Sequence, residues 1–522
     1  MKDLRFRRRL AGAIAVGTVA LLPFPALAFT PEEGTIADLH AAFAAGETTC
    51  VEVVQAYLDR IEAYDDQGPT LRAILTVSPT ALETAAEMDA AYAADPNAVG
   101  PLFCVPVILK DNYNTFDMPT SGGVAAMATS QPLTDAYAVQ QMREAGAIIL
   151  AKANLMELAM GGTTVSSLGG QTLNPYDLTR TPGGSSGGTG AAIAASFGII
   201  GTGSDTGQST RSPASAQSLV GIRATRGLVS RVGVIPLSGT QDEIGPITRT
   251  VEDAARVLQI IAGYDPADPI TAASVGNVPD YLSYLDPTAL DGARIGLLMD
   301  VVGTEERHAE VNAVLEAAIA TMESLGAEVI EITIPNFAEL TSGMGTSGAE
   351  FGGLFQAYLD ALPPEAPIRS IQALLDDGGH LEANAESLRE GLDAAAALLD
   401  PDYIAVFQRR DAFQRALYVA MAENDIDAIL YPHQRVLVAP IADGGQPERN
   451  GIVSNASGFP AVTFPGGFST PSETAPIGVP VGIELLGRPW SEGTLLGFAY
   501  AFEQAADPRL PPESTPPLAA AP

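Results

Sequence analysis

The chain has 522 residues, a formal charge of −34 at pH 7 and 46% hydrophobic residues. This length and apolar content allow one large domain with a substantial core. Phosphate backbones and anionic membranes attract Lys and Arg, so the acidic excess speaks against a nucleic-acid partner and against stable membrane anchoring. We interpret the acidity as a solvated surface that favours solubility.

The first 28 residues have the pattern of a cleavable export signal. Lys2 and Arg5 belong to a basic start, residues 10–22 form a short apolar run, and residues 26–28 fit a small-residue cleavage site. We therefore expect a mature protein that begins near Phe29 and is periplasmic or secreted.

Apolar residues then alternate between helical and strand spacing along the chain. The spacing predicts helices at 36–45, 50–65, 79–94, 134–145, 189–197, 250–262, 311–325 and 492–505. It predicts strands at 71–77, 106–112, 147–154, 198–205, 293–300, 327–335, 426–432, 459–468 and 479–487. This alternation indicates an α/β protein, which we expect to be a single α/β/α domain with a large, mixed, twisted sheet covered by helices on both faces.

Three segments define the predicted domain organisation. The folded domain spans residues 29–510, and residues 511–522, rich in Pro and Ala, form a disordered tail. Within the domain, residues 340–423 are mostly helical and irregular, and we assign them to a region over the active site. A surface insertion without such a role is the alternative.

Cys50 and Cys104 are the only cysteines of the chain. In an oxidising compartment an isolated pair more often forms a disulfide than two free thiols, so we expect a bridge between them. Two unrelated buried thiols are the alternative.

Lysine is almost absent from this chain. Apart from Lys2, only Lys110 and Lys152 are present. Arginine keeps its proton near neutral pH, whereas a desolvated lysine can act as a base. Lys110 ends the apolar strand at 106–112 and is therefore a candidate base. A buried ion pair with Asp111 or another carboxylate is the alternative, and the residues alone leave both open.

Two serine clusters, Ser185–Ser186 and Ser209, lie among glycines between residues 181 and 213. A serine on a glycine-flanked turn can be exposed as a nucleophile beside backbone N–H groups that stabilise an oxyanion. Histidine offers little support for another kind of triad, because only His433 follows a predicted strand. No cluster has recognised metal-ligand spacing, so we expect neither a metal nor another cofactor.

These serine clusters carry a resemblance to a known family. The motif PGGSSGG followed by GSDTGQSTRSPAS closely resembles the amidase signature family of Ser–Ser–Lys hydrolases. The segments GPLFCVPVILKDN, ASGFPAVTFPGGF and GVPVGIELLGRPW are similar to other parts of that family. The resemblance covers nearly the whole mature chain and is weakest at residues 340–423.

The resemblance implies catalytic roles for three residues. Ser209 takes the place of the nucleophile, Ser185 that of a bridging serine after a cis peptide bond, and Lys110 that of the base. Neutral Lys110 would withdraw a proton from Ser185, which would withdraw one from Ser209 as it attacks a carbonyl carbon. An acyl-enzyme would follow, and water would release it.

The resemblance also implies a binding site around the nucleophile. The oxyanion hole would be formed by the backbone N–H groups of Thr206, Gly207, Gln208 and Ser209. Ala159 falls in a segment that lines the acyl pocket in relatives. The family commonly has glycine where this chain has Gln208, which places a side chain beside the oxyanion hole.

The implied function is that of an exported amidase. We expect cleavage of carboxamide C–N bonds of small amides by a monomer or homodimer. An ester or carbamate hydrolase with the same three residues is one alternative. A component of a tRNA-dependent amidotransferase is another, against which the export signal speaks. The third is a binding protein that kept the fold without turnover.

Overall fold

The computed structural model describes residues 29–97 and 99–518. The predicted export signal, residues 1–28, lies outside the described residues. None of the helices in the described ranges is long and apolar enough to cross a membrane.

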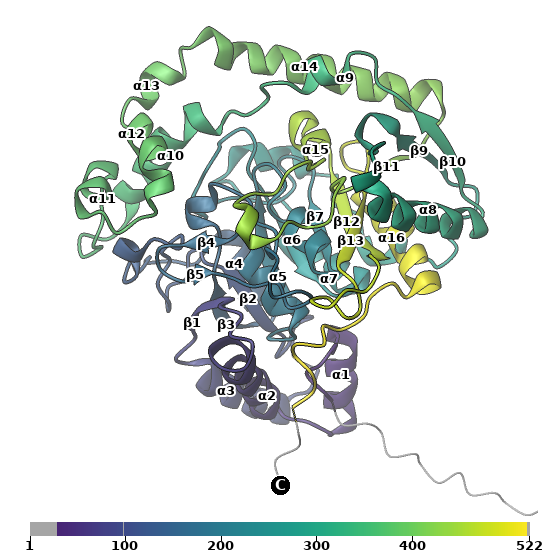
Figure 1. Cartoon of the computed structure of the whole chain (residues 1–522). Coiled ribbons are helices and arrows are strands. Elements are labelled where there is room, and N and C mark those ends of the chain that lie inside the picture. Colours follow the sequence, from purple (N-terminus) through teal and green to yellow (C-terminus); the bar gives the residue numbers. More distant parts are fainter. Residues whose placement is uncertain (1–28, 98, 519–522) are drawn as a thin grey trace, which may run out of the picture.

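A mixed sheet of 11 strands forms the centre of the molecule, in the order β1-β3-β2-β6-β8-β7-β12-β13-β11-β9-β10 (Figure 1). Its strands are β1 Ile74–Val77, β2 Pro106–Lys110, β3 Ile148–Ala153, β6 Ile200–Asp205, β7 Val220–Arg223, β8 Glu243–Thr248, β9 Arg294–Leu298, β10 Glu328–Ile332, β11 Ala428–Pro432, β12 Ala461–Phe468 and β13 Pro480–Leu486. Strand β2 is parallel to β3 and β6, and β9 is parallel to β10 and β11. The other neighbours are antiparallel, and β4 Val165–Ser166 pairs with β5 Gly170–Gln171 in a separate small sheet.

Helices cover both faces of this sheet. They are α1 Ile36–Ala45, α2 Cys50–Ile61, α3 Ala81–Ala94, α4 Tyr137–Glu144, α5 Gly187–Ala194, α6 Arg211–Ala216, α7 Val251–Ile261, α8 Ala309–Ser324, α9 Phe337–Thr341, α10 Ser347–Ala361, α11 Ile371–Asp377, α12 Ala385–Gly391, α13 Ala394–Ala397, α14 Pro401–Glu423, α15 Ile452–Ser457 and α16 Glu492–Ala506. Helices α5 and α6 pack on each other, α5 also packs on β2 and β6, and α6 packs on β7, β12 and β13, while α7 packs against α4 and α16. All five residues of β2 are buried, as a strand covered on both faces requires.

The predicted α/β architecture is confirmed, with two local differences. Helix α6 and strands β7 and β8 have no counterpart among the predicted ranges. Helix α6 and β7 span too few residues to establish a period, and Gly245 and Pro246 interrupt the apolar pattern of β8. Strand β2 ends at Lys110 rather than at residue 112, since Asp111 and Asn112 already turn out of the sheet.

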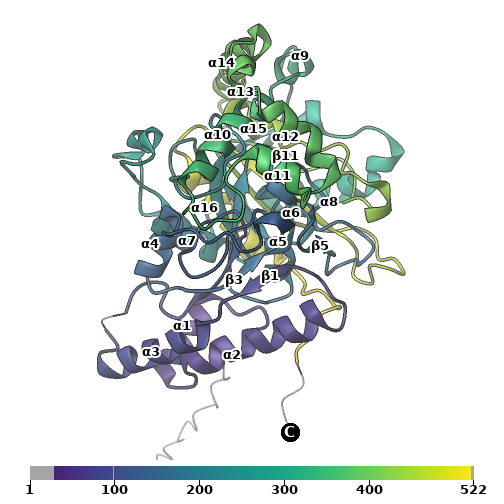
Figure 2. The same cartoon turned by 90° about the vertical axis from the view of Figure 1, so that its left-hand side faces the viewer.

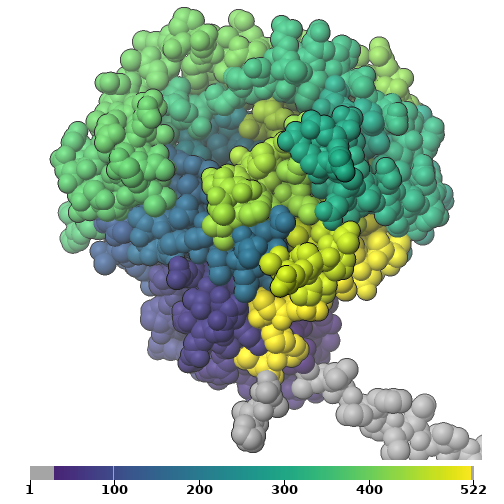
Figure 3. Space-filling view, viewed as in Figure 1, coloured from purple at the N-terminus to yellow at the C-terminus, as the bar shows by residue number. Residues whose placement is uncertain are grey.

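Helices α9 to α14 form an arch at one pole of the molecule, and α1 to α3 lie at the other (Figures 1 and 2). The arch corresponds to the region predicted at 340–423. In the space-filling view it rises along the top of the molecule above the central part (Figure 3). Its helix α10 contributes Ser347, Gly348 and Phe351 to the wall of a pocket that also contains Ser209.

The end of the described chain is held by one arginine of α2. Arg60 is buried and donates hydrogen bonds to the carbonyl oxygens of Thr515 and Pro516, at 3.0 and 3.1 Å. It also donates to Ala195 and Ser196 carbonyl oxygens in the chain that follows α5. The prediction of a disordered tail is therefore wrong for residues 511–518, because composition does not show that a buried guanidinium uses these carbonyls as acceptors.

Candidate active site

Lys110 lies at the end of β2 with its side chain fully buried. Its Nζ atom is 2.7 Å from Ser185 Oγ, 2.8 Å from Ser204 Oγ and 3.3 Å from the Ser204 carbonyl oxygen. Asn112 Nδ2 donates to the same Ser204 hydroxyl at 2.9 Å. The Lys110 amine is thus held by neutral oxygen atoms and contacts the hydroxyl of Ser185.

The charge state of Lys110 follows from this environment. Within the described ranges no carboxylate lies at ion-pair distance from its Nζ atom, because neighbouring Asp111 pairs with Lys152. Burial lowers the pKa of Lys110 to about 7, although the carboxylates of Asp205 and Asp242 oppose that shift. A substantial fraction of the amine is therefore neutral near pH 7 and able to accept a proton.

Ser185 connects Lys110 to the turn that contains Ser209. The Gly184–Ser185 peptide bond is cis, and the Ser185 carbonyl oxygen accepts a hydrogen bond from the Met156 N–H at 2.9 Å. The next residue, Ser186, donates its N–H to the Ser209 carbonyl oxygen at 3.2 Å. The two serine segments are therefore joined through main-chain atoms.

Ser209 follows β6 on a turn that lines the pocket. Its neighbours Thr206, Gly207 and Gln208 line the same pocket, as does Ala159. In the described part of the chain, the backbone N–H groups of residues 206–209 donate to no other protein atom. Such free donors on a tight turn are suited to hold an oxyanion. The pocket has a volume of about 350 Å³, enough for a small substrate.

Buried ion pairs next to this turn hold it in place. Asp205 pairs with Arg211 at 3.1 Å and with Arg223 at 2.8 Å, and Arg211 also pairs with Glu484. The two guanidinium groups hold the pKa of the Asp205 carboxyl well below its usual range, and Arg211 Nη2 donates to the Gly207 carbonyl oxygen at 2.8 Å. These contacts fix the backbone of the turn whose N–H groups have no acceptor among the described residues.

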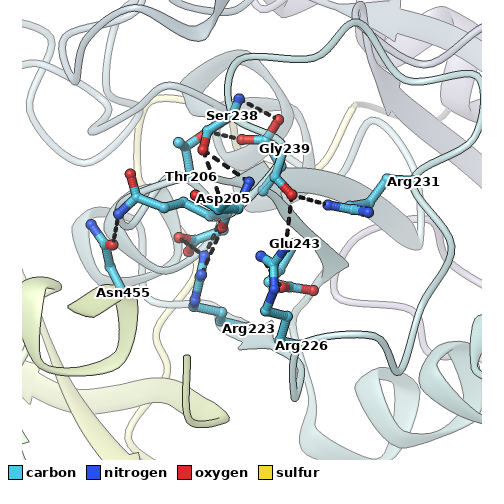
Figure 4. A network of polar contacts seen from close by, with 12 residues as sticks. Asp205, Thr206, Arg223, Arg226, Arg231, Ser238, Gly239, Glu243 and Asn455 are labelled. Carbon is cyan, nitrogen blue, oxygen red and sulfur yellow. Dashed lines mark hydrogen bonds and ion pairs between the residues drawn. The ribbon is translucent and has the colours of Figure 1, made fainter. Parts of the chain in front are cut away.

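A second set of polar contacts fixes the side chain of Thr206, the first residue of the turn. Thr206 Oγ1 donates to Asp242 Oδ1 at 2.5 Å. The Gly239 carbonyl oxygen, in the same loop as Asp242, accepts from Arg226 and Arg231 at 2.7 and 2.8 Å (Figure 4). Arg211 therefore supports the turn directly, and Arg226 and Arg231 support the loop whose Asp242 holds Thr206.

The side chain of Gln208 fits because Gly451 faces it. A Cβ atom at position 451 would collide with the Cβ and amide of Gln208. With its amide oxygen turned towards Arg449, Gln208 accepts hydrogen bonds from Nε and Nη1 at 2.6 and 2.8 Å. The extra side chain is thus directed at an arginine in the pocket wall, and the backbone N–H of Gln208 stays available.

Several of these residues were not identified from the sequence. Ser204 and Asn112 contact the lysine network, and Arg449 lines the pocket. Asn112 follows Lys110 by two residues, which is a weak signal, whereas Arg449 lies far from every serine motif. His433 is buried, with Nδ1 2.7 Å from Glu484 Oε2 beneath the turn, and it does not line the pocket.

The two cysteines are joined in a disulfide. It connects Cys50, the first residue of α2, with Cys104, just before β2, and their Cα atoms are 5.7 Å apart. The bond therefore attaches an N-terminal helix to the strand that carries Lys110.

Comparison with known proteins gives a consistent set of relatives. A family model described as amidase matches residues 52–496. A peptide amidase from Stenotrophomonas maltophilia has a similar structure, with a TM-score of 0.82 and 37% identity over 92% of this chain and 98% of that chain. One of the subunits of glutamyl-tRNA(Gln) amidotransferase from Moorella thermoacetica is 36% identical over 481 residues, 88% of this chain and 94% of that protein. The corresponding protein from Thermotoga maritima gives a TM-score of 0.70 at 28% identity, over 91% of this chain and 95% of that chain.

Proposed function

Since the chain belongs to the amidase signature family of serine amidohydrolases, we propose that it is an exported amidase that hydrolyses small carboxamides at Ser209. The observation that carries the proposal is the 2.7 Å contact between Lys110 Nζ and Ser185 Oγ, beside a pocket that contains Ser209. A buried lysine with neutral partners is the base that such a relay requires.

The reaction would begin with attack of Ser209 Oγ on the substrate carbonyl carbon. The Ser209 proton passes to Ser185 as Ser185 gives its own to neutral Lys110, and the N–H groups of residues 206–209 hold the oxyanion. The same protons return in the opposite direction to the departing amine when the C–N bond breaks. Water then attacks the acyl-enzyme by the same relay and releases a carboxylic acid and Ser209.

Two features support export of the enzyme. The basic and apolar pattern of the first 28 residues has the form of a cleavable signal. The bond between Cys50 and Cys104 suits an oxidising compartment. These features favour a secreted hydrolase over the amidotransferase role that the name of the Moorella relative describes.

A peptide amide is a second candidate substrate. The peptide amidase of Stenotrophomonas maltophilia is 37% identical to this chain. A second hollow of about 820 Å³ adjoins the pocket and shares Gly345, Gly348 and Glu390 with it, which supports a longer substrate. Hydrolysis rates for a series of acyl amides of increasing length would separate the two candidates, since only the longer substrate gains contacts in the second hollow.

The proposal is tested by labelling with a fluorophosphonate, which reacts with activated serines. The purified mature protein should gain the mass of one adduct, and the Ser209→Ala variant should gain none. Lys110→Ala should fold and label at least 100-fold more slowly, because the relay has lost its base. A folded protein that gains no adduct, or a Ser209→Ala variant that still does, would refute the assignment of the nucleophile.

A further inference from the structure

Arg449 is a cation in the wall of the candidate active site with no carboxylate partner in the part of the chain that the structure describes. It lies on the segment between β11 and α15 and lines the same pocket as Ser209. Its Nη1 atom packs against Gly162, where a Cβ atom would collide with it. The guanidinium therefore lies between Gly162 and Gln208, the residue that precedes Ser209.

The hydrogen bonds of Arg449 orient its guanidinium and leave its charge uncompensated. Nε and Nη1 donate to the neutral amide oxygen of Gln208. Nη2 has no acceptor in the residues described, so its two N–H groups remain for a ligand. Burial lowers the pKa of Arg449 from its ordinary value, as expected for a cation that loses water without gaining an anion.

In this respect Arg449, which is half-buried, differs from the fully buried arginines next to the turn. Arg211 and Arg223 are neutralised by Asp205 and Glu484. The carboxylate that precedes Arg449, Glu448, contacts His308, Arg307 and Arg435 instead. The chain contains 62 acidic residues against 28 Lys and Arg, so carboxylates are abundant. One that neutralised Arg449 would occupy the space beside the nucleophile.

Glu390 is the only carboxylate among the described residues that line this pocket. It lies in α12, is exposed, and also borders the neighbouring hollow. Water therefore screens its charge, and Glu390 forms no ion pair with Arg449. The uncompensated positive charge of the pocket lies at Arg449, which contacts Gln208, the residue that precedes Ser209.

We propose that Arg449 is an anion-binding subsite and that the preferred substrates are amides whose acyl group carries a carboxylate. This inference rests on the proposed function, because it uses the same pocket. The carboxylate would accept charge-assisted hydrogen bonds from Nη2, with Gln208 keeping the guanidinium in position. Gln208, which departs from the common glycine, then acquires a role in substrate selection.

The test compares two probes of similar length, glutaramate, which carries a carboxylate, and pentanamide, which does not. Binding is measured by calorimetry on Ser209→Ala, so that the result does not depend on turnover. We expect glutaramate to bind at least tenfold more tightly than pentanamide. Adding Arg449→Met should remove this preference and change pentanamide binding less than threefold, while Arg449→Lys should retain part of it.

Arg435→Met is the matched control, because Arg435 pairs with Glu448 and does not line the pocket. It should leave the glutaramate preference unchanged. Equal binding of the two probes, or an equal loss of both in Arg449→Met, would overturn the inference. Either result is distinguishable from failure of the proposed function, which the fluorophosphonate label reports separately.

Discussion

Asp111 Oδ1 lies 3.0 Å from Lys152 Nζ, and both side chains are buried. The carboxylate next to Lys110 in the sequence therefore neutralises the other lysine. The cause is the register of β2 and β3, in which Leu109 lies opposite Lys152, so that Asp111 emerges just beyond it. Of the two lysines, Lys152 is held in an ion pair and Lys110 remains available as a base.

The first prediction concerns the stability that this ion pair provides. Asp111→Asn leaves a buried lysine without its counter-ion, and breaking such a pair costs about 3 kcal/mol or more. The free energy of unfolding, measured with urea, should fall by that amount. Asp411→Asn is the control, because Asp411 pairs with Arg415 on an exposed face of α14 and should change the value by less than about 1 kcal/mol. Equal effects of both variants would contradict a structural role for the buried pair.

The second prediction concerns the pH dependence of hydrolysis. Burial lowers the pKa of Lys110 to about 7, and only the unprotonated amine accepts the proton of Ser185. The value of kcat/KM should therefore rise about tenfold per pH unit below pH 7 and level off above it. The measurement is kcat/KM for a neutral amide substrate between about pH 5 and 9. A rate that is independent of pH, or that falls above pH 7, would exclude neutral Lys110 as the base.

The sequence predicted the strands and the serine motifs of the site, but not which charged side chains pair with each other. The apolar runs at β2 and β6 are long enough to be predicted, and the motifs around Ser185 and Ser209 indicated their roles. For Lys110, the residues allowed either a base or an ion pair with Asp111. The choice depends on strand register, which brings Lys152 and Asp111 together and which sequence spacing does not determine.

Arg449 was missed for a related reason. It lies on an irregular segment without periodicity, and only the fold brings it next to Gln208. The departure at Gln208 was visible in the sequence. The space that accommodates its side chain comes from Gly451, far along the chain, so no local pattern connects the two.

The third prediction uses this close approach. Gly451→Ala should push the Gln208 side chain against the turn and disturb its N–H groups, since the added Cβ atom has no room. We expect kcat to fall by about 10- to 100-fold, at or somewhat below the loss typical of removing one oxyanion donor. The measurement is steady-state hydrolysis of a neutral amide. Gly445→Ala, in the same segment but with open space around it, should retain full activity. Unchanged kcat in Gly451→Ala would show that the turn tolerates the displacement.

The fourth prediction concerns the disulfide. Cys50 and Cys104 are 54 residues apart, and closing a loop of that length stabilises a protein by about 4 kcal/mol in the chain-entropy model. The Cys50→Ser, Cys104→Ser double variant should unfold at a lower temperature. Its labelling at Ser209 should be unchanged at room temperature, because neither cysteine lines the pocket. The measurement is thermal unfolding with and without reductant, and reductant should affect only the parent protein. An equal Tm for the two proteins would contradict a stabilising bond.

Because Arg60 binds residues 515 and 516, the C-terminal end of the described chain is held at one side of the molecule, which sets the orientation of an enzyme attached to a solid support through that end. These residues lie at the pole formed by α1 to α3, opposite the α9–α14 arch (Figure 1). An enzyme tethered to a bead through its C-terminal end would therefore turn the arch, and the pocket wall that α10 provides, towards the surrounding solution. Immobilisation in that orientation should keep the route for substrate open.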